Sequence, residues 1–249
     1  LALLFVSCAE KVDGYQIKGE IKGMENQQLI LELLTPTELI QIDTAQTDKN
    51  GKFTMQGNVA EKGFYRLING DKFWIVLLEN TKMKFEADAN DPKLRDVTVS
   101  KYDEGAVFQE AIQFLISKQE AYGEEAKKMQ AAMSSQTSSP AEKVAMQANF
   151  ETFQKTIMTG IKDKVTGYTE TCPYAAVYLL SSLNPQDDSE YIQKTIATLE
   201  PKLPNSVYLN NIKEVLVQVE TQKKQQAAAE AQAQKVVSGG TAPDIVMNN

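Results

Sequence analysis

Tyr102-Asp103-Glu104-Gly105 marks the point at which the hydrophobic pattern of this chain changes, and the fold follows from that change. Before this stretch, apolar residues recur at every second position, as they do in half-buried β-strands. After it, they recur at every third or fourth position, as they do on one face of an α-helix. We therefore predict two units, β and then α, which makes the fold class α+β.

The half before the boundary predicts an antiparallel β-sandwich or barrel. Its clearest strand is Tyr15-Gln16-Ile17-Lys18-Gly19-Glu20-Ile21, which alternates with period 2. Short strands recurring about every 8–12 residues, with turn signals between them, favour a sandwich or barrel over a βαβ fold. Residues 73–78 are apolar throughout, so both faces of that strand should be covered, one of them by a helix. The further predicted strands are 28–34, 38–47, 52–57, 63–68, 72–78, 82–87 and 96–100.

The half after the boundary predicts an antiparallel helical hairpin followed by more helices. Ser139-Pro140-Ala141-Glu142 has the pattern of a capping box and should begin the second helix of the hairpin. Later helices are expected near 174–182, 189–199 and 206–237, and the Ala/Gln-rich residues 225–235 should stay exposed because they offer little apolar surface to bury. We expect Phe108 or Phe114 to contact the β half. The stripe of the first helix is Phe108, Ala111, Leu115, Tyr122, Met129 and Met133, and that of the second is Met146, Phe150, Phe153, Ile157, Ile161, Val165 and Tyr168.

Composition removes most kinds of catalysis. The chain has 249 residues and no histidine, which excludes Ser-His-Asp and Cys-His catalysis and the histidine-containing zinc sites. Cys8 and Cys172 are the only two cysteines, so there is no Cys-x-x-Cys. The net charge is −7, which argues against nucleic-acid binding. We expect no catalytic residue, no metal site and no cofactor within this chain.

The first residues indicate a cellular location. An uncharged run from Leu1 to Ser7 ends at Cys8, which is typical of the end of a signal peptide and too short to span a bilayer. The spacing resembles a bacterial lipobox. That resemblance implies that lipid is attached to Cys8 and anchors the protein in the cell envelope, on the periplasmic or cell-surface side. The alternative is that these residues form a short buried strand.

Three acidic segments are candidate sites. Asp48-x-Asn50-Gly51 begins like a calcium loop, but Val59 stands where an EF-hand has its glutamate, which favours a hairpin turn. Asp88, Asn90 and Asp91 either gather around a cation or, as we prefer, end a strand and cap a turn. Asp187 and Asp188 either serve acid–base chemistry or, more simply, provide an N-cap for the next helix.

Two further positions have a functional and a structural interpretation. Cys172 precedes Pro173 and has no basic residue within three positions to lower its pKa, so an inert buried thiol is favoured over a reactive one. Trp74, with the aromatic residues Phe73, Phe64 and Tyr65, either lines a ligand groove or belongs to the core. The core interpretation is favoured because such clusters are usually buried.

Several segments resemble a known family of secreted bacterial lipoproteins. Tyr15-x-Ile17-x-Gly19-x-Ile21-x-Gly23, Ile42-Asp43-Thr44, Gly51-Lys52-Phe53 and Phe64-Tyr65-Arg66-Leu67 resemble the β domain of unknown function that precedes their thioredoxin-like domain. Residues 172–180 are similar to the helical insert that follows it. Gly240-Thr241-Ala242-Pro243-Asp244-Ile245 resembles the entry strand of TlpA/ResA-like thiol-disulfide oxidoreductases. The Cys-x-x-Cys of that family would lie past Asn249, so no residue of this chain inherits the catalytic role.

The pattern and the resemblance together imply five parts and a leading hypothesis. The parts are a signal-peptide remnant and lipobox at 1–11, the β domain at 12–103, the helical domain at 104–224, a spacer helix end and linker at 225–240, and the first strand of a thioredoxin-like domain at 241–249. The chain would be the non-catalytic region of a membrane-anchored thiol-disulfide oxidoreductase, whose partners are the membrane and cysteine-containing protein substrates. The alternatives are a self-contained envelope lipoprotein that binds a ligand or protein, and a structural interaction protein built on the helical hairpin.

Overall fold

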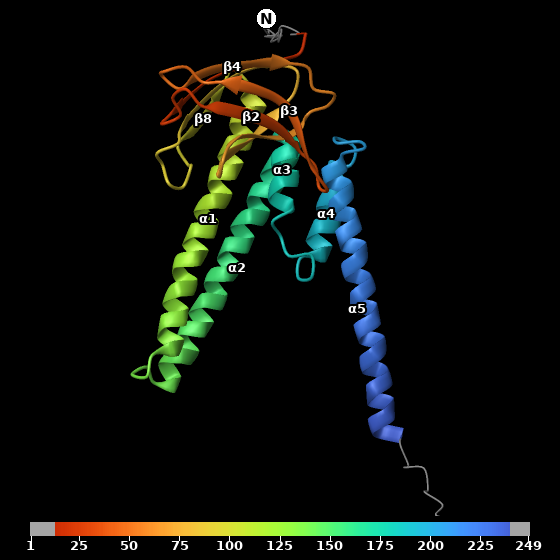
Figure 1. Cartoon of the computed structure of the whole chain (residues 1–249). Coiled ribbons are helices and arrows are strands. Elements are labelled where there is room, and N and C mark those ends of the chain that lie inside the picture. The colour runs from red at the N-terminus through yellow and green to blue at the C-terminus, as the bar shows by residue number, and fades with distance from the viewer. Residues whose placement is uncertain (1–12, 240–249) are drawn as a thin grey trace, which may run out of the picture.

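The computed structural model describes residues 13–239 and, within them, eight strands followed by five helices (Figure 1). The change from strand to helix falls between Ser100 and Asp103, where the hydrophobic pattern predicts it. Cys8 and residues 241–249 lie outside the described residues. The strands are β1 (Tyr15–Lys22), β2 (Gln28–Leu34), β3 (Leu39–Gln46), β4 (Lys52–Gly57), β5 (Gly63–Asn69), β6 (Lys72–Leu78), β7 (Lys82–Asp88) and β8 (Val97–Ser100). The helices are α1 (Asp103–Ser134), α2 (Pro140–Thr171), α3 (Pro173–Leu180), α4 (Ser189–Leu199) and α5 (Val207–Gly239).

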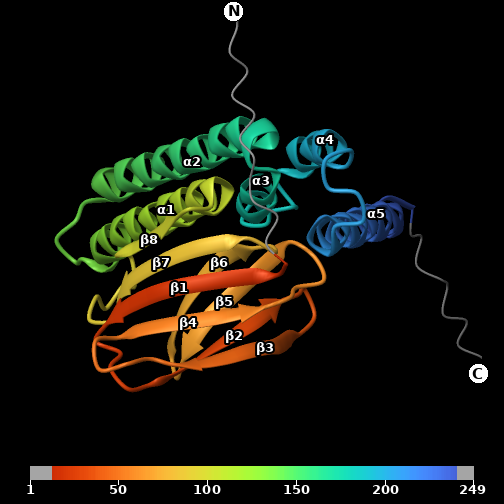
Figure 2. The same cartoon turned by 90° about the horizontal axis from the view of Figure 1, so that it is seen from above.

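The strands form two four-stranded sheets, in the orders β4-β1-β7-β8 and β3-β2-β5-β6. The sheets face each other as a sandwich (Figure 2), with Trp74 of one sheet meeting Phe85 of the other edge-on. The α+β class is confirmed. One pairing differs from the antiparallel prediction, because β1 and β7 run parallel. Alternation within a strand predicts which face is buried, but it carries no information on the direction of a partner far along the chain.

Alternation in β1 places its apolar side chains in the core. Tyr15, Ile17 and Ile21 are buried. Position 19 requires glycine, because a Cβ there would lie 2.3 Å from the ring of Phe53. Gly51 adopts φ +74°, the left-handed conformation that the hairpin turn after Asp48 requires. This backbone geometry keeps β4 paired with β1.

The two long helices α1 and α2 form the predicted hairpin. Ser139 and Glu142 make the capping box: the Ser139 hydroxyl accepts from the Glu142 amide at 3.3 Å, and the Glu142 carboxylate accepts from the Ser139 amide at 2.7 Å. The first turns of α1 pack on β6 and β8, so a helix covers the apolar strand as predicted, although Phe73 at its start is 44% exposed.

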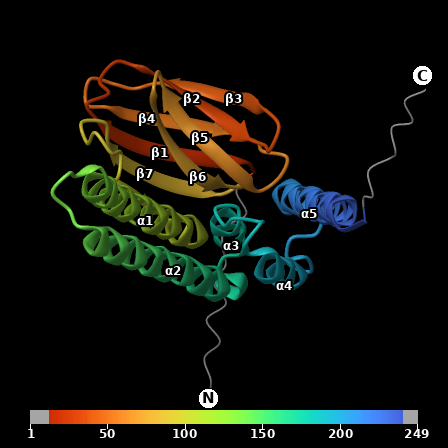
Figure 3. The same cartoon turned by 90° about the horizontal axis from the view of Figure 1, so that it is seen from below.

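The helices leave the sheets in one general direction. Figure 1 shows α1, α2 and α5 running away from the sandwich, with the shorter α3 and α4 between them near the sheets. The view from below confirms that α3 and α4 lie between α2 and α5 (Figure 3). Thus the hairpin and α5 form two arms on one β body.

Burial is concentrated in the part of each arm near the sheets, although Phe150 of α2 is also buried where it meets Tyr122. Phe108, Ala111 and Leu115 of α1 are buried, whereas Tyr122 and Met133 further along the predicted stripe are 40% and 44% exposed. The stripe is exposed there because only two helices run side by side at that distance from the sheets. In α5, side chains 221–231 are exposed, as predicted for the part of the Ala/Gln-rich segment whose side chains are described.

Candidate functional site

An aromatic cluster joins the sheets to the helices. Phe64 of β5 stacks on Phe108 of α1, with ring centroids 5.2 Å apart and planes 13° apart. Tyr174 and Tyr178 of α3 meet Phe64 edge-on at 5.9 and 5.5 Å, and Tyr208 of α5 lies tilted at 4.3 Å. We call these five residues the aromatic junction. It confirms Phe108 as the predicted contact between the two halves, and it connects three helices to a single strand residue.

A lysine lies beside the aromatic junction. Lys62 pairs with Glu79 at 3.1 Å and also with Glu104 at the start of α1. Its ammonium lies 5.6 and 5.5 Å from the ring centroids of Tyr102 and Tyr174. The side chains of Lys62 and Glu104 are 21% and 26% exposed, so their attraction is stronger than that of an exposed surface pair, whereas Glu79 is 39% exposed and contributes less. The lysine therefore ties the β body to both α1 and α3.

The hydroxyl of Tyr208 anchors the start of α5. It accepts a hydrogen bond from the Phe64 amide at 3.0 Å and donates one to the Leu34 carbonyl at 2.8 Å. One side chain thus bonds strands β5 and β2 at once. Further along α5, the side chains of Leu209, Ile212, Leu216 and Val219 are buried. The first three turns of α5 are therefore fixed to the body, and the later turns extend beyond it.

Cys172 lies between α2 and α3, next to this anchoring region. It is buried, with its sulfur 3.8 Å from Glu104 Oε1, and burial raises the pKa of the thiol to about 12. At neutral pH the group is therefore a protonated thiol and a poor nucleophile. The structure supports the inert interpretation of Cys172 over the reactive one.

The inner side of the hairpin arm carries a cleft of about 710 Å³. It lies between α2 and the turn that follows α3, where Tyr122, Met158 and Asn184 meet. Lys162 and Asp188 form an ion pair at 2.5 Å in its wall. A smaller hollow of about 210 Å³ shares Tyr122 and Met158 with it. The cleft mixes apolar and charged groups, which suits a protein surface more than a small charged ligand.

Of the acidic segments, the one at Asp48 is a hairpin turn, and the one at Asp188 forms an ion pair. The Asp48 carboxylate accepts from the amides of Asn50 at 2.8 Å and Lys52 at 2.9 Å, which supports the hairpin interpretation. These bonds hold the pKa of Asp48 below its usual range. Asp188 occupies the N-cap position of α4, but its side chain makes no capping bond. It pairs with Lys162 instead, so the expected role of Asp188 as a capping side chain is wrong.

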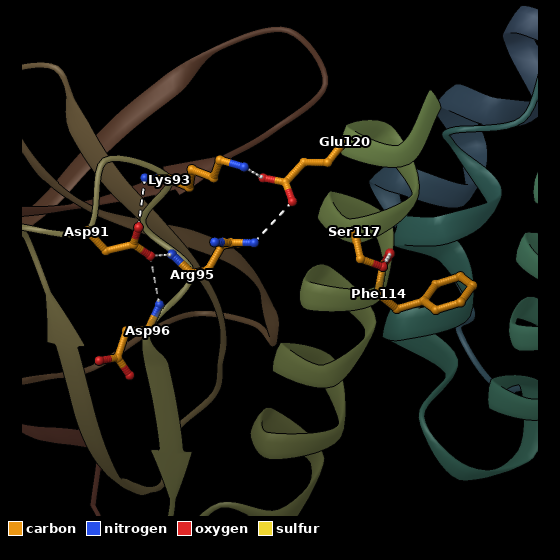
Figure 4. A network of polar contacts seen from close by, with 7 residues as sticks. All are labelled: Asp91, Lys93, Arg95, Asp96, Phe114, Ser117 and Glu120. Carbon is orange, nitrogen blue, oxygen red and sulfur yellow. Dashed lines mark hydrogen bonds and ion pairs between the residues drawn. The ribbon is translucent and has the colours of Figure 1, made fainter. Parts of the chain in front are cut away.

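The third acidic segment is a structured turn between β7 and β8. The Asp91 carboxylate accepts from the amides of Lys93, Arg95 and Asp96, at 3.0, 2.6 and 3.3 Å (Figure 4). Lys93 and Arg95 in turn reach Glu120 of α1, at 2.8 and 3.1 Å. The segment thus caps its own backbone and is fastened to the first helix, which supports the turn interpretation.

Two absences concern the described part of the chain alone. Between residues 13 and 239, no three side chains of the His, Cys, Asp or Glu type gather as a metal ion would need. Over the same range, no helix combines the length and hydrophobicity needed to cross a membrane.

Sequence reasoning missed the residues that hold the arms. Lys62 directly precedes β5, Glu79 directly follows β6 and Tyr208 lies in α5, and each stands in an ordinary local pattern. Tyr208 directly precedes the buried Leu209, and nothing in that spacing shows that its hydroxyl reaches Leu34. The only local hint was Glu104, a charged residue at the boundary between the two halves.

The comparisons with known proteins concern the β half. Residues 15–108 match the family described as domain of unknown function (DUF4369), which confirms the resemblance to a domain of unknown function there. The match ends at Phe108, the α1 residue that stacks on Phe64. No curated protein matches the chain.

Proposed function

We propose that this chain is the non-catalytic region of a membrane-anchored thioredoxin-like thiol-disulfide oxidoreductase, and that it positions the redox domain or recruits its substrates. The observation that carries the proposal is the form of α5. Its first turns are fixed to the body through Tyr208, and its side chains at 221–231 are exposed. Such a helix suits a spacer better than a core element.

The length of α5 supports the same role. A helix of 33 residues is about 50 Å long at roughly 1.5 Å per residue. The hairpin arm, with 32 residues in each helix, has a similar length. On this proposal the redox domain begins at residue 241, after α5, and its Cys-x-x-Cys lies past Asn249. The cleft on the inner side of the hairpin arm would then be the surface that receives a substrate protein.

The direct test is the coding sequence after Asn249. A Cys-x-x-Cys in a strand-to-helix context within the next hundred codons supports the oxidoreductase, and an early stop codon contradicts it. A biochemical test is insulin reduction with purified residues 9–249. Exchange requires two neighbouring thiols, and Cys172 lies alone and buried among the described residues, so we expect no turnover. Turnover by this polypeptide would contradict the assignment of a non-catalytic region.

The proposed membrane attachment has its own test. Replacing Cys8 with Ser in the full-length protein should move it from the membrane to the soluble fraction in a detergent-partition experiment. A Cys172→Ala substitution, which removes the other thiol and leaves residues 1–11 intact, serves as the control and should leave partitioning unchanged. Equal partitioning of the Cys8→Ser variant and the parent would contradict lipid attachment at that residue.

A second candidate function is a self-contained envelope lipoprotein that binds a ligand or protein. The cleft of about 710 Å³ on the hairpin arm favours it, since a protein-binding module needs a formed concave surface and no redox domain. The same coding-sequence test separates the two candidates. A stop codon soon after Asn249 would favour the binding module.

A further inference from the structure

Another cavity, separate from the cleft, lies between β6 and α1. Its volume is about 280 Å³, close to the lower end of the roughly 300–1,000 Å³ usual for small-molecule sites. Apolar side chains form most of its wall: Ile75 from β6, Ile112 and Ile116 from α1, and Leu94 and Val97 from the turn before β8 and its first residue. A molecule that fits here must be small and mainly apolar.

Three residues that line this cavity each carry a buried polar atom without a partner among the described residues. The atoms are Trp74 Nε1, Gln109 Oε1 and Gln113 Nε2, each buried and without a hydrogen bond within residues 13–239. Trp74 is 3% exposed and Gln109 is 6% exposed. Buried polar atoms in native proteins are normally paired, because leaving one unpaired is destabilising. Three residues of this kind in the lining of a single cavity point to an occupant that provides the missing hydrogen bonds.

The chemistry of these groups limits the occupant. The indole nitrogen of Trp74 can only donate, so the occupant must offer an acceptor to it. Each glutamine amide can turn over to present either its oxygen or its nitrogen, so the occupant can donate to or accept from Gln109 and Gln113. The charged residue in the lining is Lys93, and Glu120 neutralises it at 2.8 Å. Neither an anion nor a cation would find an unpaired countercharge in this wall.

The turn between β7 and β8 closes one side of the cavity. Leu94 adopts φ +51°, a conformation that is unfavourable for leucine, and it contributes to the cavity wall. The turn is held by Asp91 from within and by Glu120 from α1 (Figure 4). These contacts keep the strained leucine over the cavity, and the ion pairs are exposed enough to open without a large cost.

From this arrangement we infer that the cavity between β6 and α1 binds a small uncharged molecule with an apolar body and an amide-like polar edge, through Trp74, Gln109 and Gln113. Such a molecule would bind whether or not a redox domain follows this chain. The site differs in place and in character from the cleft on the hairpin arm.

The experiment uses the single tryptophan of the chain. Trp74 lines the cavity, so its fluorescence reports on the occupant directly. The full 249-residue chain is titrated with benzamide, with toluene as the apolar analogue and with benzoate as the charged one. We expect a saturable change with benzamide, at least tenfold weaker binding of toluene, and no saturation with benzoate.

Substitutions in α1 locate the response. Gln109→Leu should weaken benzamide binding about tenfold, the size expected for one lost hydrogen bond, and Ile116→Phe should fill the cavity and abolish binding. Gln130→Leu, on an exposed part of the same helix, should bind like the parent. If Ile116→Phe fails to fold, comparing benzamide binding by Gln109→Leu and by Gln130→Leu still tests whether the cavity is the binding site. A cavity that holds only water would give no saturable response to any probe. That result, or equal weakening by Gln109→Leu and Gln130→Leu, overturns the inference.

Discussion

At the scale of single residues, the contacts that matter most join parts distant in sequence. The Tyr208 hydroxyl bonds residues 144 and 174 positions away. Lys62 pairs with Glu104 across 42 positions. These side chains stabilise the junction because each satisfies several partners in a place with little water. Removing the Tyr208 hydroxyl alone should therefore have a measurable effect on stability.

Removing the hydroxyl in Tyr208→Phe should lower the free energy of unfolding by about 1–3 kcal/mol, because the Phe64 amide would lose its bond and stay unsatisfied. Urea denaturation followed by circular dichroism measures the change. The matched control is Tyr122→Phe, whose hydroxyl accepts only from Gln154 at 3.1 Å in an exposed position. That control should change stability by less than about 0.5 kcal/mol. Equal effects of the two substitutions would contradict the anchoring role.

Cys172 should be chemically silent in the folded protein. Burial raises its pKa to about 12, so thiolate is scarce at pH 8 and the sulfur is inaccessible. An aromatic disulfide reagent at pH 8 should label Cys172 only as fast as the protein opens, and urea near the unfolding midpoint should accelerate labelling strongly. Labelling at the rate of a free thiol without urea would show that the thiol is accessible.

At the scale of elements, local pattern was enough to place most of the fold. The strands predicted at 28–34 and 72–78 and the helix predicted at 189–199 coincide with β2, β6 and α4. Alternation and helical period report the buried face of an element directly, which explains this agreement. The parallel pairing of β1 with β7 was missed because it depends on strands far apart in the chain.

The capping box offers a test at this scale. Ser139→Ala should remove the acceptor of the Glu142 amide at the start of α2. The free energy of local opening of the first turn should then fall by about 1 kcal/mol. Hydrogen exchange of the amides from 141 to 146 measures this opening. Ser138→Ala removes a neighbouring hydroxyl that lies outside the capping box, and it should leave those amides unchanged. Unchanged exchange in the Ser139→Ala variant would contradict the role of the box in starting the helix.

At the scale of the whole molecule, the candidate sites were less predictable than the fold. Trp74 was expected in the core, and it is buried there, but the cavity beside it forms only when α1 comes to lie along β6. In the same way, the cleft on the hairpin arm requires α2 to meet the turn after α3. Sites that form between distant elements leave no periodic signal in the sequence, because each wall looks like an ordinary amphipathic segment.

Buried ionisable groups at and beside the aromatic junction should make the protein sensitive to alkali. Burial raises the pKa of Tyr65 and Tyr174 from 10.0 to about 12, and that of Cys172 from 9.0 to about 12. Above pH 9 to 10 the unfolded chain therefore binds fewer protons than the folded one, so the free energy of unfolding falls as pH rises toward 12. Below pH 9 this contribution is fully present.

Urea midpoints measured at intervals from pH 8 to pH 11.5 check this expectation. Tyr174→Phe should make the decline shallower, because one of the buried hydroxyls no longer ionises on unfolding. Tyr122→Phe removes the hydroxyl of an exposed tyrosine and should leave the pH dependence of the urea midpoint unchanged. A midpoint that stays constant up to pH 11.5 would show that these groups ionise without opening the junction.

The exposed part of α5 has a consequence for direction as well as for distance. An α-helix turns about 100° and advances about 1.5 Å with each residue. Whatever is joined to the end of α5 therefore takes its azimuth from the number of residues in between. Losing one residue would rotate that attachment by about 100° while drawing it in by only about 1.5 Å. The exposed segment 221–231 has 11 residues, about three full turns, so its loss would shorten the arm by about 16 Å and leave the azimuth almost unchanged.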